Sequence, residues 1–234
     1  MEYSSLQTIW FILTAILFTI YAIFDGFDLG VGIIHLFLKS EDERRLNMNS
    51  VGPFWDGNEV WLIAGGGALF AAFPPVYAAV WSGFYVAFIL LLVALTARAL
   101  AFEYRTKMTT ESGKRVCDFC FDLGSLFAAL LLGVAWGNIL SGVPIDTNGE
   151  FVGTFWTLLN PYAILVGLLT LLLFTLQGML WLMMKVEGLS AYELPKRAQV
   201  LLRIIVVLYF LTSILTMWIN PSLFVVVWTW LTLT

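Results

Sequence analysis

Long apolar segments separated by short polar ones make up almost the whole chain. A helix needs about 20 mostly apolar residues to cross the hydrocarbon core of a bilayer. Segments of this kind predict membrane-spanning helices at about residues 6–37, 54–73, 76–102, 117–141, 156–184 and 200–219. Runs such as Phe88 to Leu95 lack the alternation of a transmembrane strand, so the pattern favours helices over a closed β-barrel. We therefore predict an all-α integral membrane protein, a polytopic helical bundle with about six complete spans.

Basic residues fall in every second connection between these spans. The first, third and fifth connections contain lysine and arginine, whereas the segment before the first span, the second and fourth connections and the tail after Asn220 contain none. Connections rich in positive charge stay on the cytoplasmic side of a membrane. The pattern therefore predicts that the N-terminus lies outside and that the first, third and fifth connections face the cytoplasm.

The spans are expected to form two groups. Residues 1–141 are predicted to make a first four-helix transmembrane bundle, and residues 142–234 an incomplete second bundle with spans near 156–184 and 200–219. The segment from Ser222 to Thr234 is apolar but too short to span. We interpret it as the start of a seventh helix that was cut, or as a natural truncation.

Composition supports a membrane protein and excludes several other classes. Hydrophobic residues make up 60% of the chain and charged residues 12%, whereas soluble proteins carry roughly 25% charge. A net charge of −4 without a basic run argues against nucleic acid as a partner. The single histidine excludes a haem or metal site built on paired imidazoles, and two cysteines cannot hold a disulfide scaffold.

Two isolated features are interpreted as incidental. Cys117 and Cys120 form a C-x-x-C pattern, but the chain offers neither two further soft ligands nor a thioredoxin-like context. His35 follows the first span near the predicted cytoplasmic surface, where a lone histidine is more often solvated than ligating.

Ionisable residues inside predicted spans gather toward the cytoplasmic side. Such residues are costly in a bilayer and mark a functional hypothesis by default. They are Asp25 and Asp28 in the first span, Asp56 and Glu59 in the second, Arg98 and Glu103 near the end of the third, and Asp118 and Asp122 at the start of the fourth.

The spacing of these residues predicts shared helix faces. Asp25 and Asp28 are separated by three positions, and so are Asp56 and Glu59, so each pair lies on one face. Two carboxylates in a medium of low dielectric constant cannot both ionise cheaply, so one should hold a proton near neutral pH. Arg98 is the natural counter-ion. Such a cluster, open toward the cytoplasm, is typical of an inward proton path.

A structural interpretation of the same residues stays open on this spacing alone. Asp56 and Glu59 lie where the helix dipole favours negative charge, and Asp118 with Asp122 is best interpreted as a capping pair. Arg98 could extend its side chain to the membrane interface. Asp25 fits this interpretation least well, because it lies about 28 Å along its helix from the N-terminus.

The polar segments also carry motifs of specific sequence. These are YAIFDGFDLGVG at 21–32, GPFWDGNEVWLI at 52–63, GGALFAAFP at 66–74, SGFY at 82–85, FEYR at 102–105 and GVAWGN at 133–138. Together and in this order they resemble subunit II of the cytochrome bd ubiquinol oxidases. The resemblance covers residues 8 to about 190, which is most of the chain.

The resemblance implies an integral subunit of a quinol oxidase that reduces oxygen to water and builds a proton gradient. It implies a heterodimer with subunit I, which holds the b-type and d-type haems, so no haem, other cofactor or metal ligand and no catalytic residue is expected on this chain. In some members a quinone with a structural role is bound to subunit II. The expected location is the bacterial or archaeal cell (inner) membrane, with the lipid bilayer as the other partner.

The resemblance also implies roles for individual residues. The family's subunit II supplies a proton route from the cytoplasm toward the oxygen-reducing haem. By motif, its members here would be Asp56, Trp61 and Glu103, with Arg98 as a charge partner and Asp25 as a further acid. Secondary polar members would be Asp28, Asn58 and Glu59.

Two other functions remain as alternatives. Acids within the membrane and the glycines at 65–67 are also compatible with a secondary transporter or proton channel, although no counterpart of this glycine run is evident in the later half. A purely structural membrane subunit would use every acid as a cap or a salt-bridge partner. Family members are longer and have two four-helix bundles, so this chain is expected to be a fragment or a truncated form.

Overall fold

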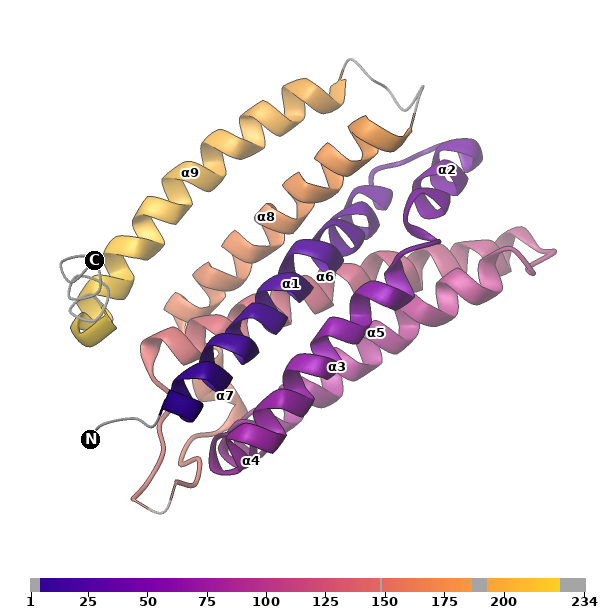
Figure 1. Cartoon of the computed structure of the whole chain (residues 1–234). Helices are drawn as coiled ribbons and strands as arrows, with labels where there is room; N and C mark the ends of the chain where they lie inside the picture. Colours follow the sequence, from indigo (N-terminus) through magenta and orange to yellow (C-terminus); the bar gives the residue numbers. More distant parts are fainter. Residues whose placement is uncertain (1–4, 148, 187–192, 224–234) are drawn as a thin grey trace.

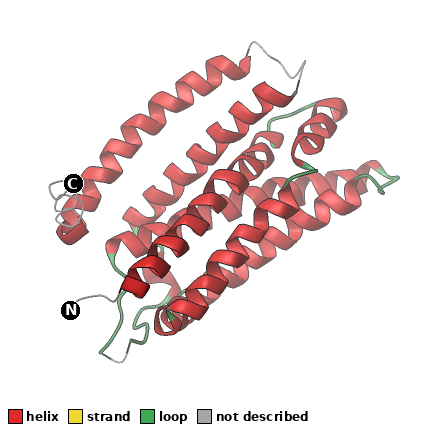
Figure 2. Ribbon diagram, viewed as in Figure 1, coloured by secondary structure: helices red, strands yellow, loops and turns green. Residues whose placement is uncertain are grey.

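Helices make up nearly all of the regular structure of this protein. The computed structural model describes residues 5–147, 149–186 and 193–223. The helices of this part are α1 (Ser5–His35), α2 (Glu41–Val51), α3 (Trp55–Ala72), α4 (Pro74–Gly83), α5 (Tyr85–Arg105), α6 (Glu111–Ser141), α7 (Phe155–Leu158), α8 (Pro161–Lys185) and α9 (Glu193–Ile219) (Figure 1). No strand is drawn in the described residues, and an isolated bridge joins Ile145 and Phe151 (Figure 2). The predicted all-α class is confirmed.

Five helices are long and apolar enough to cross a membrane, which confirms a multi-pass protein. They are α1, α5, α6, α8 and α9. The remaining predicted span, at 54–73, corresponds to α3, which is 18 residues long and packs along α1. This helix does not count among the five because its first turns carry Asp56, Asn58 and Glu59. The structure therefore supports five spans by length and composition, with α3 as a shorter and more polar helix beside them.

Local sequence explains where the helices begin and end. Pro74 and Pro75 start α4, because proline is tolerated in the first turn of a helix. α4 ends at Gly83, and α5 begins after Phe84. The predicted span at 76–102 is thus divided. The predicted span at 156–184 begins instead at Pro161, where the Asn160 side chain accepts a hydrogen bond from the Ala163 amide.

Close approach of backbones holds the central helices together. α6 packs against α5, α8 and α1, and α1 also packs against α3 and α8. Gly30 of α1 meets Gly178 of α8, and a Cβ atom at Gly30 would lie 1.8 Å from the Phe174 carbonyl oxygen. Small residues at such crossings are typical of membrane helices. α9 lies at one edge of the bundle and packs mainly on α8 (Figure 1).

The predicted division at residue 141 and the predicted orientation stay predictions. α8, which was assigned to the second group of spans, packs directly on α1 and α6. α2 and the α5–α6 connection lie at one end of the bundle, and α4 and α7 lie at the other (Figure 1). We call the first of these the cytoplasmic end, following the distribution of basic residues. Most of the predicted start of a seventh helix, residues 224–234, lies outside the described residues.

Candidate functional site

A buried arginine lies at the contact of three helices. Arg98 of α5 is fully buried, and its Nη1 atom donates hydrogen bonds to Asp25 Oδ1 of α1 at 3.2 Å and to Glu59 Oε1 of α3 at 2.6 Å. Gly124 of α6 lets this part of α5 approach, because a Cβ atom there would lie 2.5 Å from the Ala94 carbonyl oxygen and 3.1 Å from the Arg98 amide nitrogen. Burial and shared pairing make Arg98 the counter-ion that its position in the sequence predicts.

One face of α1 carries the acids that turn toward this arginine. Tyr21, Asp25 and Asp28 follow each other at intervals of four and three residues, so they share a face, and Asp25 and Asp28 are fully buried. Asn58 of α3 donates to Asp28 Oδ2 at 2.7 Å and to the Phe24 carbonyl oxygen at 3.3 Å. We call the group defined by this pairing the Arg98 cluster: Asp25, Asp28, Asn58, Glu59 and Arg98.

Several buried polar atoms in and beside the Arg98 cluster have unused hydrogen-bonding capacity. Within the described part of the chain no partner is found for Asp25 Oδ2, Asp28 Oδ1, Arg98 Nε, Arg98 Nη2, Tyr21 OH and Ser125 Oγ. Buried polar groups are normally hydrogen-bonded, and exceptions call for a functional explanation. Groups that can still gain or lose a hydrogen-bond partner are what proton transfer needs.

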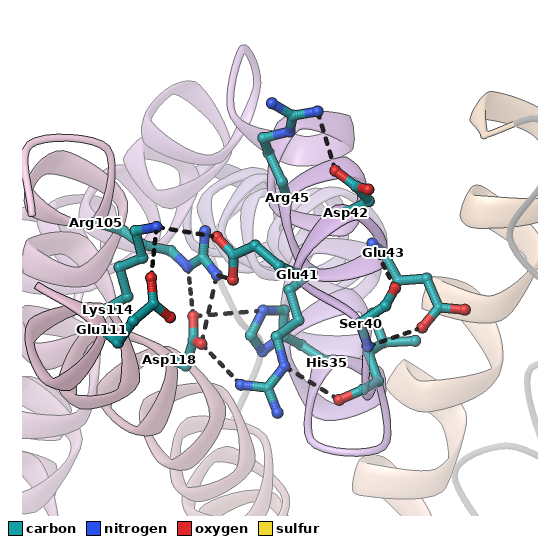
Figure 3. A network of polar contacts seen from close by, with 12 residues as sticks. His35, Ser40, Glu41, Asp42, Glu43, Arg45, Arg105, Glu111, Lys114 and Asp118 are labelled. Atoms are coloured by element: carbon teal, nitrogen blue, oxygen red, sulfur yellow. Dashed lines mark hydrogen bonds and ion pairs between the residues drawn. The ribbon is translucent and has the colours of Figure 1, made fainter. Parts of the chain in front are cut away.

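A second polar network lies nearer the cytoplasmic end. His35, the last residue of α1, is fully buried, with its Nδ1 atom 2.6 Å from Asp122 Oδ1 of α6. Asp118, one turn earlier on α6, accepts hydrogen bonds from Arg105 of α5 and, at 2.7 Å, from Arg44 of α2. We call these five residues the His35 network. Figure 3 shows His35, Arg105 and Asp118 converging at this point, with Glu41 bonded to Arg105 at 2.9 Å.

The His35 network corrects two predictions. His35 is not solvated, because α1 continues to this residue and places its ring edge-on against Phe121 of α6. Asp118 and Asp122 are not caps, because α6 begins at Glu111 with Thr110 as its N-cap. Both acids therefore lie about two to three turns inside the helix, where Asp118 pairs with arginine and Asp122 with the imidazole of His35.

A short helix in the first connection brings Arg44 to this network. The Glu43 amide donates to Ser40 Oγ at 3.2 Å, and the Ser40 amide donates to Glu43 Oε2 at 3.3 Å, which forms a capping box at the start of α2. Hydrogen bonding of the Glu43 carboxylate to the Ser40 backbone amide, and secondly to the Ser40 side chain, holds the pKa of Glu43 below its ordinary value. Ser40 therefore defines where α2 begins, four residues before Arg44.

The remaining predicted site residues lie outside the Arg98 cluster. Asp56 is exposed in the first turn of α3, and Trp61 is half-buried on the same helix. Glu103 is 64% exposed and lies 3.7 Å from Lys107. The structure thus brings Asp25, Asp28, Asn58, Glu59 and Arg98 together and leaves Asp56, Trp61 and Glu103 apart from them.

A small pocket lies beside Glu103 at the cytoplasmic end. Its volume is about 170 Å³, and its walls include Glu103, Trp55, Phe102 and Arg105. Trp55 and Phe102 stack with their ring centroids 5.0 Å apart. The Phe102 ring also lies 5.8 Å from the Arg98 guanidinium carbon, so one aromatic side chain contacts both the pocket and the Arg98 cluster.

The sequence analysis did not identify Tyr21 and Ser125, which lie beside the Arg98 cluster. Tyr21 has the same helix face as Asp25, which was a usable signal, whereas nothing in the sequence near Ser125 points to the cluster. Among the described residues no group of three or more histidine, cysteine, aspartate or glutamate side chains is placed to hold a metal ion. Cys117 and Cys120 are free thiols.

A bundle of long apolar helices around a buried arginine and its carboxylates defines a polytopic membrane protein with an internal charge site. The family model described as cytochrome bd terminal oxidase subunit II matches residues 6–234. The chain belongs to this family.

Individual relatives agree with this assignment. The chain is 40% identical over 222 residues to cytochrome bd-I ubiquinol oxidase subunit 2 of Escherichia coli, covering 93% of this chain and 59% of that protein. It is 39% identical over 205 residues to cytochrome bd ubiquinol oxidase subunit 2 of Bacillus subtilis, covering 87% of this chain and 61% of the relative. The chain therefore spans about three fifths of the length of these relatives.

A solved structure supports the fold. A chain of the bd oxidase structure from Geobacillus thermodenitrificans superposes with a TM-score of 0.71 at 17% sequence identity. The match covers 92% of this chain and 65% of the other. The helical arrangement described above is thus shared with that oxidase.

Proposed function

We propose that this chain acts as the non-haem subunit II of a cytochrome bd-type quinol:oxygen oxidoreductase in a bacterial cell membrane. It binds the haem-bearing subunit I, and it supplies a proton path from the cytoplasm toward the oxygen-reducing haem. The isolated chain is not itself catalytic. The observation that carries the proposal is the fully buried Arg98, which joins carboxylates of α1 and α3 in a chain of this family.

The proposed path starts at the cytoplasmic end of α3. Asp56 is exposed there, and Glu59 follows one turn later with 21% of its side chain exposed. Arg98 keeps its charge and holds Glu59 and Asp25 on the same guanidinium nitrogen, which places a partly exposed acid and a fully buried acid next to each other on the proposed path. Glu103, which lines the pocket, forms a second point where protons enter. Trp61 is assigned to the wall of the path.

The haems of such an oxidase fit the partner subunit and not this chain. Haem iron takes axial ligands such as histidine, and the one histidine here is buried with Nδ1 held by Asp122. In the assembled enzyme the haems would supply electron transfer and oxygen reduction. This chain's residues would hold and pass protons, and its apolar outer faces would contact subunit I and lipid.

The Asp56→Asn variant of the assembled complex tests the proton role. We expect oxygen-dependent quinol oxidation to slow about tenfold or more, because the amide cannot carry a proton, while the haem absorbance per complex stays unchanged. Asp42→Asn is the matched control, since Asp42 is 85% exposed on α2 and pairs only with the exposed Arg45 among the ion pairs of the described residues.

The structural alternative gives a different result. If every acid merely stabilises packing, the complex that assembles with Asp25, Asp56 and Glu103 all replaced by amides would turn over at the unmodified rate per haem. That result would refute the proton path. A colourless homomer on purification, without a haem-bearing partner, would favour a transporter or channel instead.

A further inference from the structure

The Arg98 cluster contains more carboxylates than cations. Asp25, Asp28 and Glu59 surround one guanidinium group, and the described residues place no second lysine or arginine in ion-pair contact with them. An uncompensated charge inside a membrane protein is energetically unfavourable, so such a site recruits a positive charge or loses a negative one. The Glu59 side chain is 21% exposed, so it retains contact with the surroundings. The two fully buried acids, Asp25 and Asp28, are therefore the ones to compare.

Asp25 and Asp28 differ in their partners. Asp25 receives a hydrogen bond from Arg98 Nη1, whereas Asp28 makes no ion pair with any described residue. The hydrogen-bond partner of Asp28 is the neutral amide of Asn58, which donates to Oδ2 at 2.7 Å. An amide satisfies one acceptor site without offsetting a charge. Asp28 is therefore the carboxyl group with the least electrostatic support.

The geometry also indicates which oxygen of Asp28 would carry a proton. Asn58 Nδ2 gives one hydrogen to the Phe24 carbonyl oxygen and the other to Asp28 Oδ2, so Oδ2 acts as an acceptor. Oδ1 is buried and has no partner among the described residues. Tyr21 of α1 and Ser125 of α6 are further buried polar groups near this face of α1, the latter packed against Gly32 one turn beyond Asp28.

We propose that Asp28 is a resident proton-binding site, a neutral carboxylic acid with its proton on Oδ1, while Asp25 and Glu59 share the charge of Arg98. Its part in turnover rests on the proposed function: the proton on Oδ1 passes inward, the carboxylate that remains is reprotonated from the cytoplasmic side through Asp56 and Glu59, and no charge accumulates. The proton itself is a property of the resting protein.

Infrared difference spectroscopy on the assembled complex tests this assignment. A protonated carboxyl group has a carbonyl band that moves in D2O and on labelling with carboxyl-13C aspartate. We expect Asp28→Asn to remove one such band, and the exposed-site variant Asp42→Asn to leave it unchanged. If Asp28→Asn leaves every protonated-carboxyl band in place, Asp28 is ionised and the proposal is wrong.

A second variant covers the case in which Asp28→Asn does not assemble. Asn58→Leu removes the hydrogen bond to Oδ2 but keeps the acid, so the aspartate band should shift in frequency and persist. Absence of any aspartate-dependent band in the unmodified complex would overturn the proposal without a variant.

The two proposals fail separately. If Asp28→Asn removes the band but turnover is normal, the stored proton stands and Asp28 has no part in the path. If Asp56→Asn slows turnover while no protonated aspartate is found, the path stands and the assignment to Asp28 falls.

Discussion

The Arg98 cluster and the His35 network are both buried groups of acids and cations, yet they differ in how completely they are paired. In the His35 network each acid has a basic partner, since Asp118 is bound by both Arg44 and Arg105 and Asp122 by His35, although the buried His35 Nε2 atom has no hydrogen bond among the described residues. In the Arg98 cluster, one guanidinium group serves three carboxyl groups and several polar atoms have no described partner.

This difference separates a stabilising network from one suited to proton transfer. Buried ion pairs that are fully hydrogen-bonded fix a local structure, whereas partly satisfied ones cost free energy. The His35 network joins α1, α2, α5 and α6 at the cytoplasmic end, so we interpret it as a structural tie. The Arg98 cluster contains more carboxyl groups than cations, which is the arrangement that the proposed proton path requires.

Removing the cation of the Arg98 cluster should have the largest effect. In Arg98→Leu the buried Asp25 and the partly buried Glu59 lose their counter-ion, and breaking a buried pair costs about 3–5 kcal/mol. We expect little assembled complex, measured as haem-containing yield and thermal unfolding in detergent. Arg45→Leu is the control, because its side chain is 64% exposed. Equal yields for the two variants would contradict the counter-ion role.

Neutralising Asp118 should destabilise the protein while leaving its turnover intact. Asp118→Asn weakens the hydrogen bonds from Arg44 and Arg105, at a cost of about 2–4 kcal/mol in thermal unfolding. Quinol oxidation per haem should stay near that of the unmodified complex. Asp25→Asn, measured in parallel, should show the opposite pattern of slower turnover with a smaller loss of stability. If both variants behaved alike, the two networks would not have separate roles.

The smallest effect is expected at the start of α2. Ser40→Ala removes the capping box and should cost about 1 kcal/mol. The lowered pKa of Glu43 adds a pH dependence: its contribution is complete above the ordinary pKa of glutamate and is lost as pH falls through the lower value of the folded state. Alanine keeps the Ser40 backbone hydrogen bond to Glu43 and loses the side-chain one, so the difference in unfolding temperature between Ser40→Ala and the unmodified complex should narrow in acid without vanishing. A pH-independent difference would argue against a contribution of the Ser40 side chain to the lowered pKa of Glu43.

Some of this architecture follows from the linear pattern alone. The lengths of the apolar segments predicted α1, α5, α6, α8 and α9 as membrane spans. This was possible because a helix in lipid satisfies its backbone hydrogen bonds within its own segment, whatever its neighbours are. Asp25 and Arg98 were recognisable for the same reason, since a charge within an apolar run is conspicuous without knowledge of its neighbours. Spacing also placed Asp25 and Asp28 on one face of α1.

Only the tertiary structure decided which faces meet. The spacing on α6 could not show that Asp118 and Asp122 pair with basic side chains of other helices instead of capping, because Arg44 comes from a helix folded back in the first connection. It also could not separate the exposed Asp56 from Glu59, one turn away and bound to Arg98. Helical periodicity determines which residues share a face, but contacts between helices depend on close approaches such as Gly30 with Gly178, which bring together residues far apart in the chain.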